Sequence, residues 1–68
     1  MLRPDQMWYK IGGIVMVLAE QLNITPERAL ELFYTSKTCE ELHDPSTLLY
    51  TFGNRYIADE VIAEYRGM

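Results

Sequence analysis

The longest apolar run of the chain, residues 7–22, constrains the fold more than any other stretch. Apolar residues recur there at steps of three and four, the spacing that lines one face of an α-helix. That face carries Met7, Ile11, Ile14, Leu18 and Leu22, and Trp8 and Val15 widen it, while Gln6, Lys10, Gly13 and Gln21 fall near the opposite face. The other segments are shorter, so we expect them to pack on this helix.

The same run is too short to be a membrane span. Lys10 and Glu20 bound its uncharged part, whereas a spanning helix needs roughly 20 mostly apolar residues. A signal peptide also fits poorly, because Asp5 follows Arg3 closely and no small-residue cleavage site comes after the apolar core. We therefore expect no membrane association, and the single cysteine, Cys39, without an export signal indicates a cytoplasmic protein.

Two adjacent glycines, Gly12 and Gly13, interrupt this helix. Each disfavours a helix by about 1 kcal/mol relative to alanine, so the packing of the apolar face must offset the loss. Adjacent glycines are typical of a close helix crossing or a kink. A phosphate-binding loop would need further glycines and a following lysine, which favours close packing over ligand binding.

Two further helix starts come next in the sequence. Thr25 can cap a helix in which Pro26 takes the first position and Glu27 favours the positive end of the dipole. This helix buries Ala29, Leu30 and Phe33 and ends near Thr35 or Ser36. The segment 38–41 has the form of a capping box, with Thr38 and Glu41 as its partners, and predicts a short helix that stops before Asp44-Pro45.

The last helix is expected over about residues 54–66. Its buried face comprises Ile57, Ala58, Val61, Ile62 and Tyr65, and Asp59, Glu60 and Glu64 face water. Between the short helix and this one, we expect an ordered loop that packs Leu49, Tyr50 or Phe52 on the core. The sequence thus predicts a single all-α domain over residues 1–68, a small bundle of three main helices plus a short one, packed on the N-terminal helix.

Charge, size and cysteine count limit the kinds of partner that this chain can have. The chain has 68 residues, six basic and ten acidic, for a net charge of −4. Nucleic-acid binding depends on basic residues that neutralise phosphates, so this balance argues against it. A chain this small buries a limited core, and one cysteine cannot make an internal disulfide. Support from a second protein chain, either a copy of itself or a partner, is therefore expected.

The pair Cys39 and His43 is the candidate for nucleophilic chemistry, because residues four apart on a helix can face each other. A helix this short is a poor rigid support, and a buried cysteine beside a histidine at a helix end is the favoured interpretation. The acidic groups Glu40, Glu41, Asp44, Asp59, Glu60 and Glu64 are interpreted as solvated faces, without a calcium-type loop. We predict no catalytic residue, cofactor, metal site or small-molecule substrate, and hence no enzyme.

Aromatic residues are numerous for this length: one Trp, five Tyr and two Phe. Tyr and Trp near Met are typical of the centres of protein interfaces. The interface candidates are Trp8, Tyr9, Gly12, Met16, Tyr34, Tyr50, Phe52 and Tyr56. The sequence therefore predicts a non-enzymatic protein–protein interaction module, self-associating as a homo-oligomer or bound to a partner protein.

The alternative is a small helix-turn-helix regulator that binds DNA. Residues 25–35 followed by the short helix at 38–43 would form the motif. The recognition helix would then carry Glu40 and Glu41 and no arginine, a composition that repels phosphates.

Leu42-His43, Gly53 and the run Tyr56-Ile57-Ala58-Asp59-Glu60-Val61 follow one another in the second half of the chain. In these residues the chain resembles a family of small uncharacterised bacterial proteins with a Leu-His step, a glycine turn and a Tyr-Ile-x-acid-acid-apolar helix. The segment 44–52 between the step and the glycine is longer than is usual in that family. Some members are encoded beside toxin-like enzymes, so the resemblance implies an antitoxin-like or accessory role.

Overall fold

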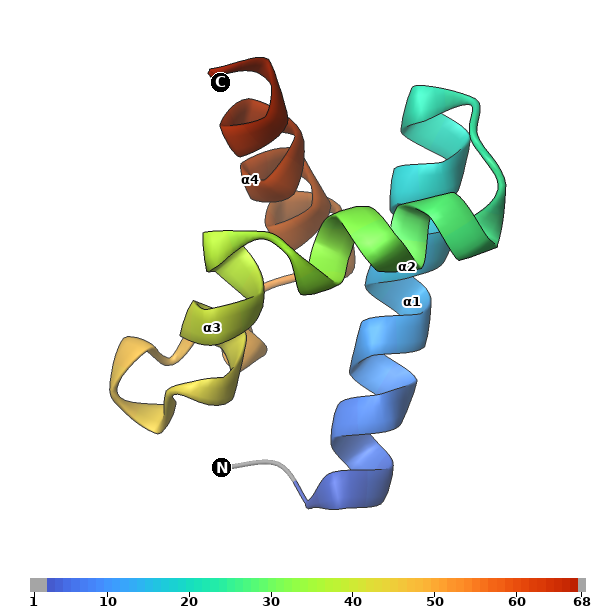
Figure 1. Cartoon of the computed structure of the whole chain (residues 1–68). Helices are drawn as coiled ribbons and strands as arrows, with labels where there is room; N and C mark the ends of the chain where they lie inside the picture. Colours follow the sequence, from blue (N-terminus) through green and yellow to red (C-terminus); the bar gives the residue numbers. More distant parts are fainter. Residues whose placement is uncertain (1–2, 68) are drawn as a thin grey trace.

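The computed structural model describes residues 3–67 as an all-α bundle, in which four helices and two 3-10 turns are found (Figure 1). The helices are α1 (Pro4–Leu22), α2 (Pro26–Tyr34), α3 (Lys37–His43) and α4 (Asn54–Arg66), and the turns η1 (Pro45–Thr47) and η2 (Leu49–Thr51) connect α3 to α4. Both α2 and α4 pack against α1, α2 crossing it near its middle. The predicted all-α bundle built on the N-terminal helix is confirmed.

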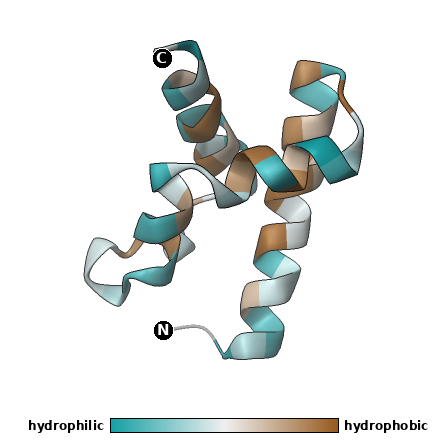
Figure 2. Ribbon diagram, viewed as in Figure 1, coloured by the Kyte–Doolittle hydropathy of each residue, from teal (hydrophilic) through white to brown (hydrophobic). Residues whose placement is uncertain are grey.

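The core face of α1 follows the predicted spacing. Ile11, Ile14 and Leu18 are buried, as are Val15 and Ala19. Asn23 ends the helix in the left-handed conformation, as predicted, with φ 55° and ψ 49°. Trp8 is the exception, because it is 66% exposed and does not widen the core face. Hydrophobic ribbon segments accordingly recur along α1 where α2 and α4 meet it (Figure 2).

The start of α2 is also as predicted. Thr25 Oγ1 accepts a hydrogen bond from the Arg28 backbone N–H at 3.2 Å, which satisfies one free amide of the first turn. Ala29 and Phe33 are fully buried, and Leu30 packs partly against the core.

The predicted capping box at 38–41 is wrong. Ser36 caps α3, because its Oγ accepts from the Cys39 backbone N–H at 3.1 Å. The helix therefore begins at Lys37, and Thr38 lies inside its first turn, where it is buried at 4% exposure. The sequence pattern located this short helix but placed its cap two residues late.

The segment between α3 and α4 is an ordered loop, as expected. Asp44 Oδ1 accepts from the Ser46 backbone N–H at 3.0 Å, which starts η1. Leu48 then takes a left-handed conformation, φ 56°, between the two turns. Of the three core candidates of this loop, Leu49 is buried and Tyr50 half-buried, whereas Phe52 is 45% exposed.

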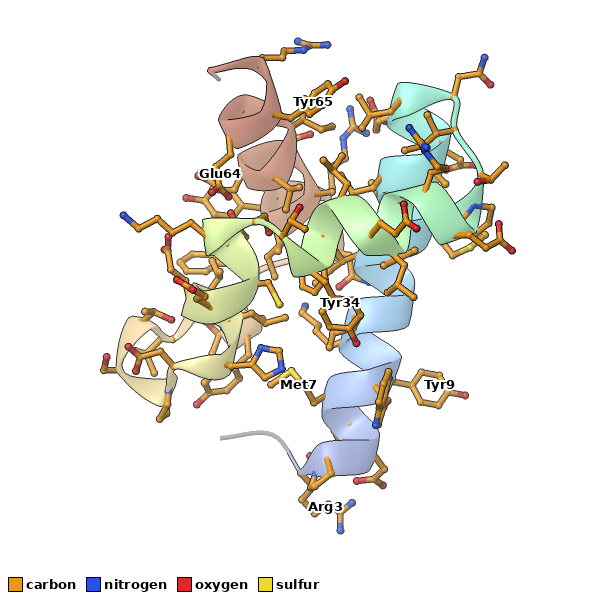
Figure 3. All side chains as sticks on the ribbon, in the orientation of Figure 1. Arg3, Met7, Tyr9, Tyr34, Glu64 and Tyr65 are labelled. Carbon is orange, nitrogen blue, oxygen red and sulfur yellow. The ribbon has the colours of Figure 1, made fainter. Side chains whose placement is uncertain are left out.

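The inner face of α4 carries Ile57, Ala58, Val61 and Ile62, all buried as predicted. Two expectations for its last turns are wrong. Tyr65 is 54% exposed rather than buried, and Glu64 turns toward α3 instead of facing water. Figure 3 shows these neighbouring side chains leaving α4 in different directions. Within residues 3–67, no helix is both long and apolar enough to cross a membrane.

Candidate functional site

The side of α1 that faces away from the core is also apolar. Trp8, Gly12 and Met16 follow one another at intervals of four residues, so they form one row along the helix. Trp8 is 66% and Met16 57% exposed, and Tyr9 beside them is 89% exposed. Figure 3 shows Tyr9 projecting away from the bundle. We call these four residues (Trp8, Tyr9, Gly12 and Met16) the α1 surface.

A shallow groove runs beside this row, between α1 and the start of α2. Its lining is almost wholly apolar and comprises Trp8, Ile11, Gly12, Val15, Met16, Pro26, Glu27 and Leu30. A second depression crosses the row toward α4 and reaches Gly13 and Asn54. Gly12 belongs to both hollows, so the centre of the α1 surface is a low point flanked by Trp8 and Met16.

The two glycines have different surroundings. A Cβ on Gly13 would overlap the Asn54 side-chain amide at the start of α4, so Gly13 lies at a close contact between the two helices. This location corrects the expectation that Gly13 falls on the face opposite the core. A Cβ on Gly12 would meet no described atom within 4 Å. Close packing thus explains Gly13 within one chain, whereas Gly12 faces open space.

The other interface candidates do not belong to the α1 surface. Phe52 and Tyr56 stack on each other with ring centroids 4.9 Å apart, and they are 45% and 49% exposed. Lys10 Nζ donates to the Phe52 carbonyl and so ties this end of the loop to α1. Tyr34 is half-exposed on α2 beside Phe33, at a centroid distance of 5.9 Å. Tyr50 is half-buried against the core.

Cys39 and His43 do come together, but in a structural arrangement. The Cys39 Sγ lies 3.9 Å from His43 Nδ1, and the same nitrogen lies 2.8 Å from the Cys39 carbonyl oxygen. Burial, and next the charge of Glu40, raise the pKa of the Cys39 thiol. A raised pKa leaves less thiolate, the form that attacks substrates. The favoured interpretation of a buried cysteine beside a histidine at a helix end therefore agrees with this geometry.

Glu64 has a role that sequence reasoning missed. Its carboxylate accepts from the backbone N–H groups of Lys37 at 2.8 Å and Thr38 at 2.9 Å, and from the Thr38 hydroxyl. Burial raises the pKa of this carboxyl, but the hydrogen bonds from Thr38 and Lys37 outweigh it and the net pKa is lowered. Glu64 thus fastens the start of α3 to α4. The contact joins residues 26 apart, so no local pattern could indicate it.

The remaining acidic candidates Glu40, Glu41, Asp44, Asp59 and Glu60 are exposed, as expected. Asp44 has a lowered pKa because the Ser46 backbone and side chain donate to it. Among residues 3–67, no three His, Cys, Asp or Glu side chains gather where they could hold a metal ion.

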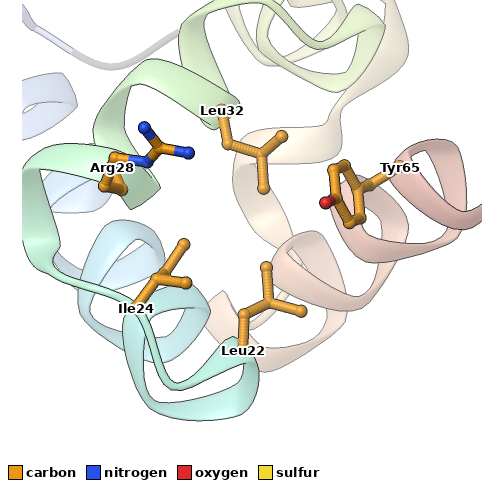
Figure 4. Close-up of a pocket in the computed structure, with 5 residues that line it drawn as sticks. All are labelled: Leu22, Ile24, Arg28, Leu32 and Tyr65. Atoms are coloured by element: carbon orange, nitrogen blue, oxygen red, sulfur yellow. The ribbon is translucent and has the colours of Figure 1, made fainter.

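One small pocket lies between the end of α1, α2 and the last turn of α4 (Figure 4). Leu22, Ile24 and Leu32 form its apolar walls, and Arg28 and Tyr65 lie at its edge. Its volume is about 170 Å³, below the roughly 300–1,000 Å³ typical of small-molecule sites. None of the predicted site residues lines it.

The short helix α3 is poorly suited to reading DNA. Thr38, Cys39 and Leu42 are buried on it, and its exposed residues are Lys37, the acidic Glu40 and Glu41, and His43. Phosphates would be repelled by that charge. Comparisons with protein-family models, with curated proteins and with solved structures found no match. The resemblance of residues 42–61 to a bacterial family therefore stays a prediction.

Proposed function

We propose that this chain is a non-enzymatic interaction module that binds another protein chain through the α1 surface. The observation that carries this proposal is the row Trp8, Gly12 and Met16, which is apolar and exposed on a helix whose other side already fills the core. A helix with one apolar face normally presents charged residues to water. Tryptophan, tyrosine and methionine are also enriched at interface centres.

Two residues from the groups that suggested chemistry have structural roles instead. The Cys39 thiol is buried with a raised pKa, and the Glu64 carboxylate is engaged by the first turn of α3. These contacts support a binding function over a catalytic one. An antitoxin-like or accessory role would be one form of it, in which the partner is a second protein.

Photo-crosslinking tests the proposal in the organism that makes this protein. A benzophenone amino acid replaces Tyr9, the most exposed aromatic residue of the α1 surface. A matched chain carries the same probe at Glu60, which is exposed on α4. We expect a discrete adduct of higher mass from position 9 and none from position 60. An absence of adducts from position 9, with the chain folded and expressed, would overturn the proposal.

A further inference from the structure

We infer that the occupant of the α1 surface is a second copy of this chain, with the two α1 helices crossing antiparallel at Gly12. The inference rests on the proposed interaction function and names its partner. Gly12 is the point of closest possible approach, because a Cβ there would meet no described atom within 4 Å and the groove and the depression both include it.

The row is suited to a twofold axis through Gly12. Trp8 precedes Gly12 by one turn and Met16 follows it by one turn. In an antiparallel crossing, Trp8 of each copy therefore meets Met16 of the other. A contact between a thioether and an aromatic ring is favourable. Residues in i±4 rows are also those that interdigitate in the commonest class of helix packing. A closed twofold dimer requires such a self-complementary surface.

The order of residues in the row favours the antiparallel direction over the parallel one. A parallel crossing would place Trp8 against Trp8 and Met16 against Met16. It would also bring together the two Glu20 carboxylates, which are exposed one turn beyond Met16. An antiparallel crossing keeps these carboxylates apart and places each near the positive end of the other α1 dipole. Arg3 adds no net charge there, because its Nε lies 3.9 Å from Asp5 Oδ1.

The exposed area indicates a reversible dimer. Trp8 and Tyr9 are 66% and 89% exposed, which corresponds to roughly 300 Å² from these two rings. Met16 and the α2 wall of the groove, Pro26 and Leu30, add to it. A standard stable interface buries about 800 Å² on each partner. The α1 surface is therefore smaller than a standard interface and suits a weak dimer, which forms and dissociates with protein concentration.

Sedimentation analysis over a concentration series tests the inference, together with the fluorescence of the single tryptophan, Trp8. We expect a monomer at about 1 μM and a dimer at several hundred μM, with Trp8 emission moving to shorter wavelength as the dimer forms. Gly12→Leu should abolish the dimer, because the added side chain fills the crossing point while the monomer has room for it. Tyr65→Ser, which removes an exposed ring outside the α1 surface, should leave the dimer unchanged.

Sedimentation and crosslinking together distinguish a failure of this inference from a failure of the proposed function. A chain that stays monomeric at several hundred μM overturns the second copy as the occupant. If the probe at position 9 then crosslinks to another protein in the native host, the interaction function stands with a different partner. If that probe gives no adduct and the chain stays monomeric, both proposals fall.

Discussion

Helices α1 and α4 pack against each other, yet their outer faces differ. Both bury apolar residues in the common core, among them Ile14 and Leu18 on α1 and Ile57 and Val61 on α4. Away from the core, α4 carries the exposed rings of Tyr56 and Tyr65, but charged residues lie between them, with Arg55 Nε 3.7 Å from Asp59 Oδ1 one turn later. In the same situation α1 carries Trp8, Tyr9 and Met16, which are more than half exposed.

The difference supports the proposed interaction through the outer face of α1. Charged residues like those of α4 are what water favours on a surface helix. Exposed apolar residues occur singly on most proteins, whereas the row on α1 lies beside an apolar groove. Packing also explains Gly13, through its contact with Asn54, and leaves Gly12 without a neighbour. The two halves of the Gly-Gly pair thus belong to two different faces.

The strongest test of this comparison truncates one residue on each face of α1. Leu18→Ala should lower the free energy of unfolding by about 2–5 kcal/mol, because Leu18 is fully buried in the core. Met16→Ala should change it by less than about 0.5 kcal/mol in dilute monomer, because that side chain is exposed. Urea unfolding at micromolar concentration measures both. Similar losses for the two variants would mean that Met16 is packed within the chain.

The second test exploits the glycine pair. Gly13→Leu should cost about 1–3 kcal/mol of stability, since its side chain would displace Asn54 and push α1 from α4. Gly12→Leu is the matched control and should not destabilise dilute monomer, because a side chain there meets open space. Thermal unfolding followed by circular dichroism compares them. Equal melting temperatures would contradict the close contact between Gly13 and α4.

Much of the fold could be predicted because its determinants are local. The apolar spacing of residues 7–22 gave the core face of α1, and Thr25-Pro26-Glu27 gave the start of α2. Spacing does not determine the burial of residues at the margin of a face. Trp8 and Tyr65 lie at such margins, and both proved more than half exposed. Spacing determines which residues share a face, but the position of the neighbouring helix decides how far burial extends.

The candidate site was predictable only in its residue types. The excess of aromatic residues predicted an interface, which stays a prediction, and the structure shows only that four of the eight candidates share one exposed face of α1. Their grouping depends on where α2 and α4 leave α1 uncovered, which is a tertiary property. The role of Glu64 could not be predicted for the same reason. Its carboxylate accepts hydrogen bonds from backbone amides 26 and 27 positions away in the sequence.

Glu64 provides the third test, on the otherwise charged and exposed side of α4. Glu64→Gln should lower stability by about 1–2 kcal/mol at neutral pH, because a charge-assisted cap of α3 is weakened. Against the effect of burial, the hydrogen bonds from Thr38 and Lys37 hold the pKa of the folded Glu64 carboxyl below its ordinary value. Its contribution is therefore present above the ordinary glutamate pKa of about 4.3 and disappears as the pH falls through the lower folded pKa.

Melting temperatures of both chains from neutral to acidic pH check this prediction. The difference between wild type and Glu64→Gln should shrink toward low pH. Glu60→Gln, one turn earlier and exposed, should show almost no difference at any pH. A gap for Glu64→Gln that persists unchanged in acid would mean that the carboxylate charge does not stabilise α3.

The smallest expected effect concerns Gly12 and has the opposite sign. Gly12→Ala should raise the stability of dilute monomer by about 0.5–1 kcal/mol, because alanine favours the helix and its Cβ meets no described atom within 4 Å. If two α1 helices cross at Gly12, the same methyl group should weaken their association. One substitution would then stabilise the monomer and oppose the dimer. Unfolding in dilute solution measures the first effect, and sedimentation at high concentration measures the second. A variant that gains stability and associates as well as wild type would show that Gly12 is not the crossing point.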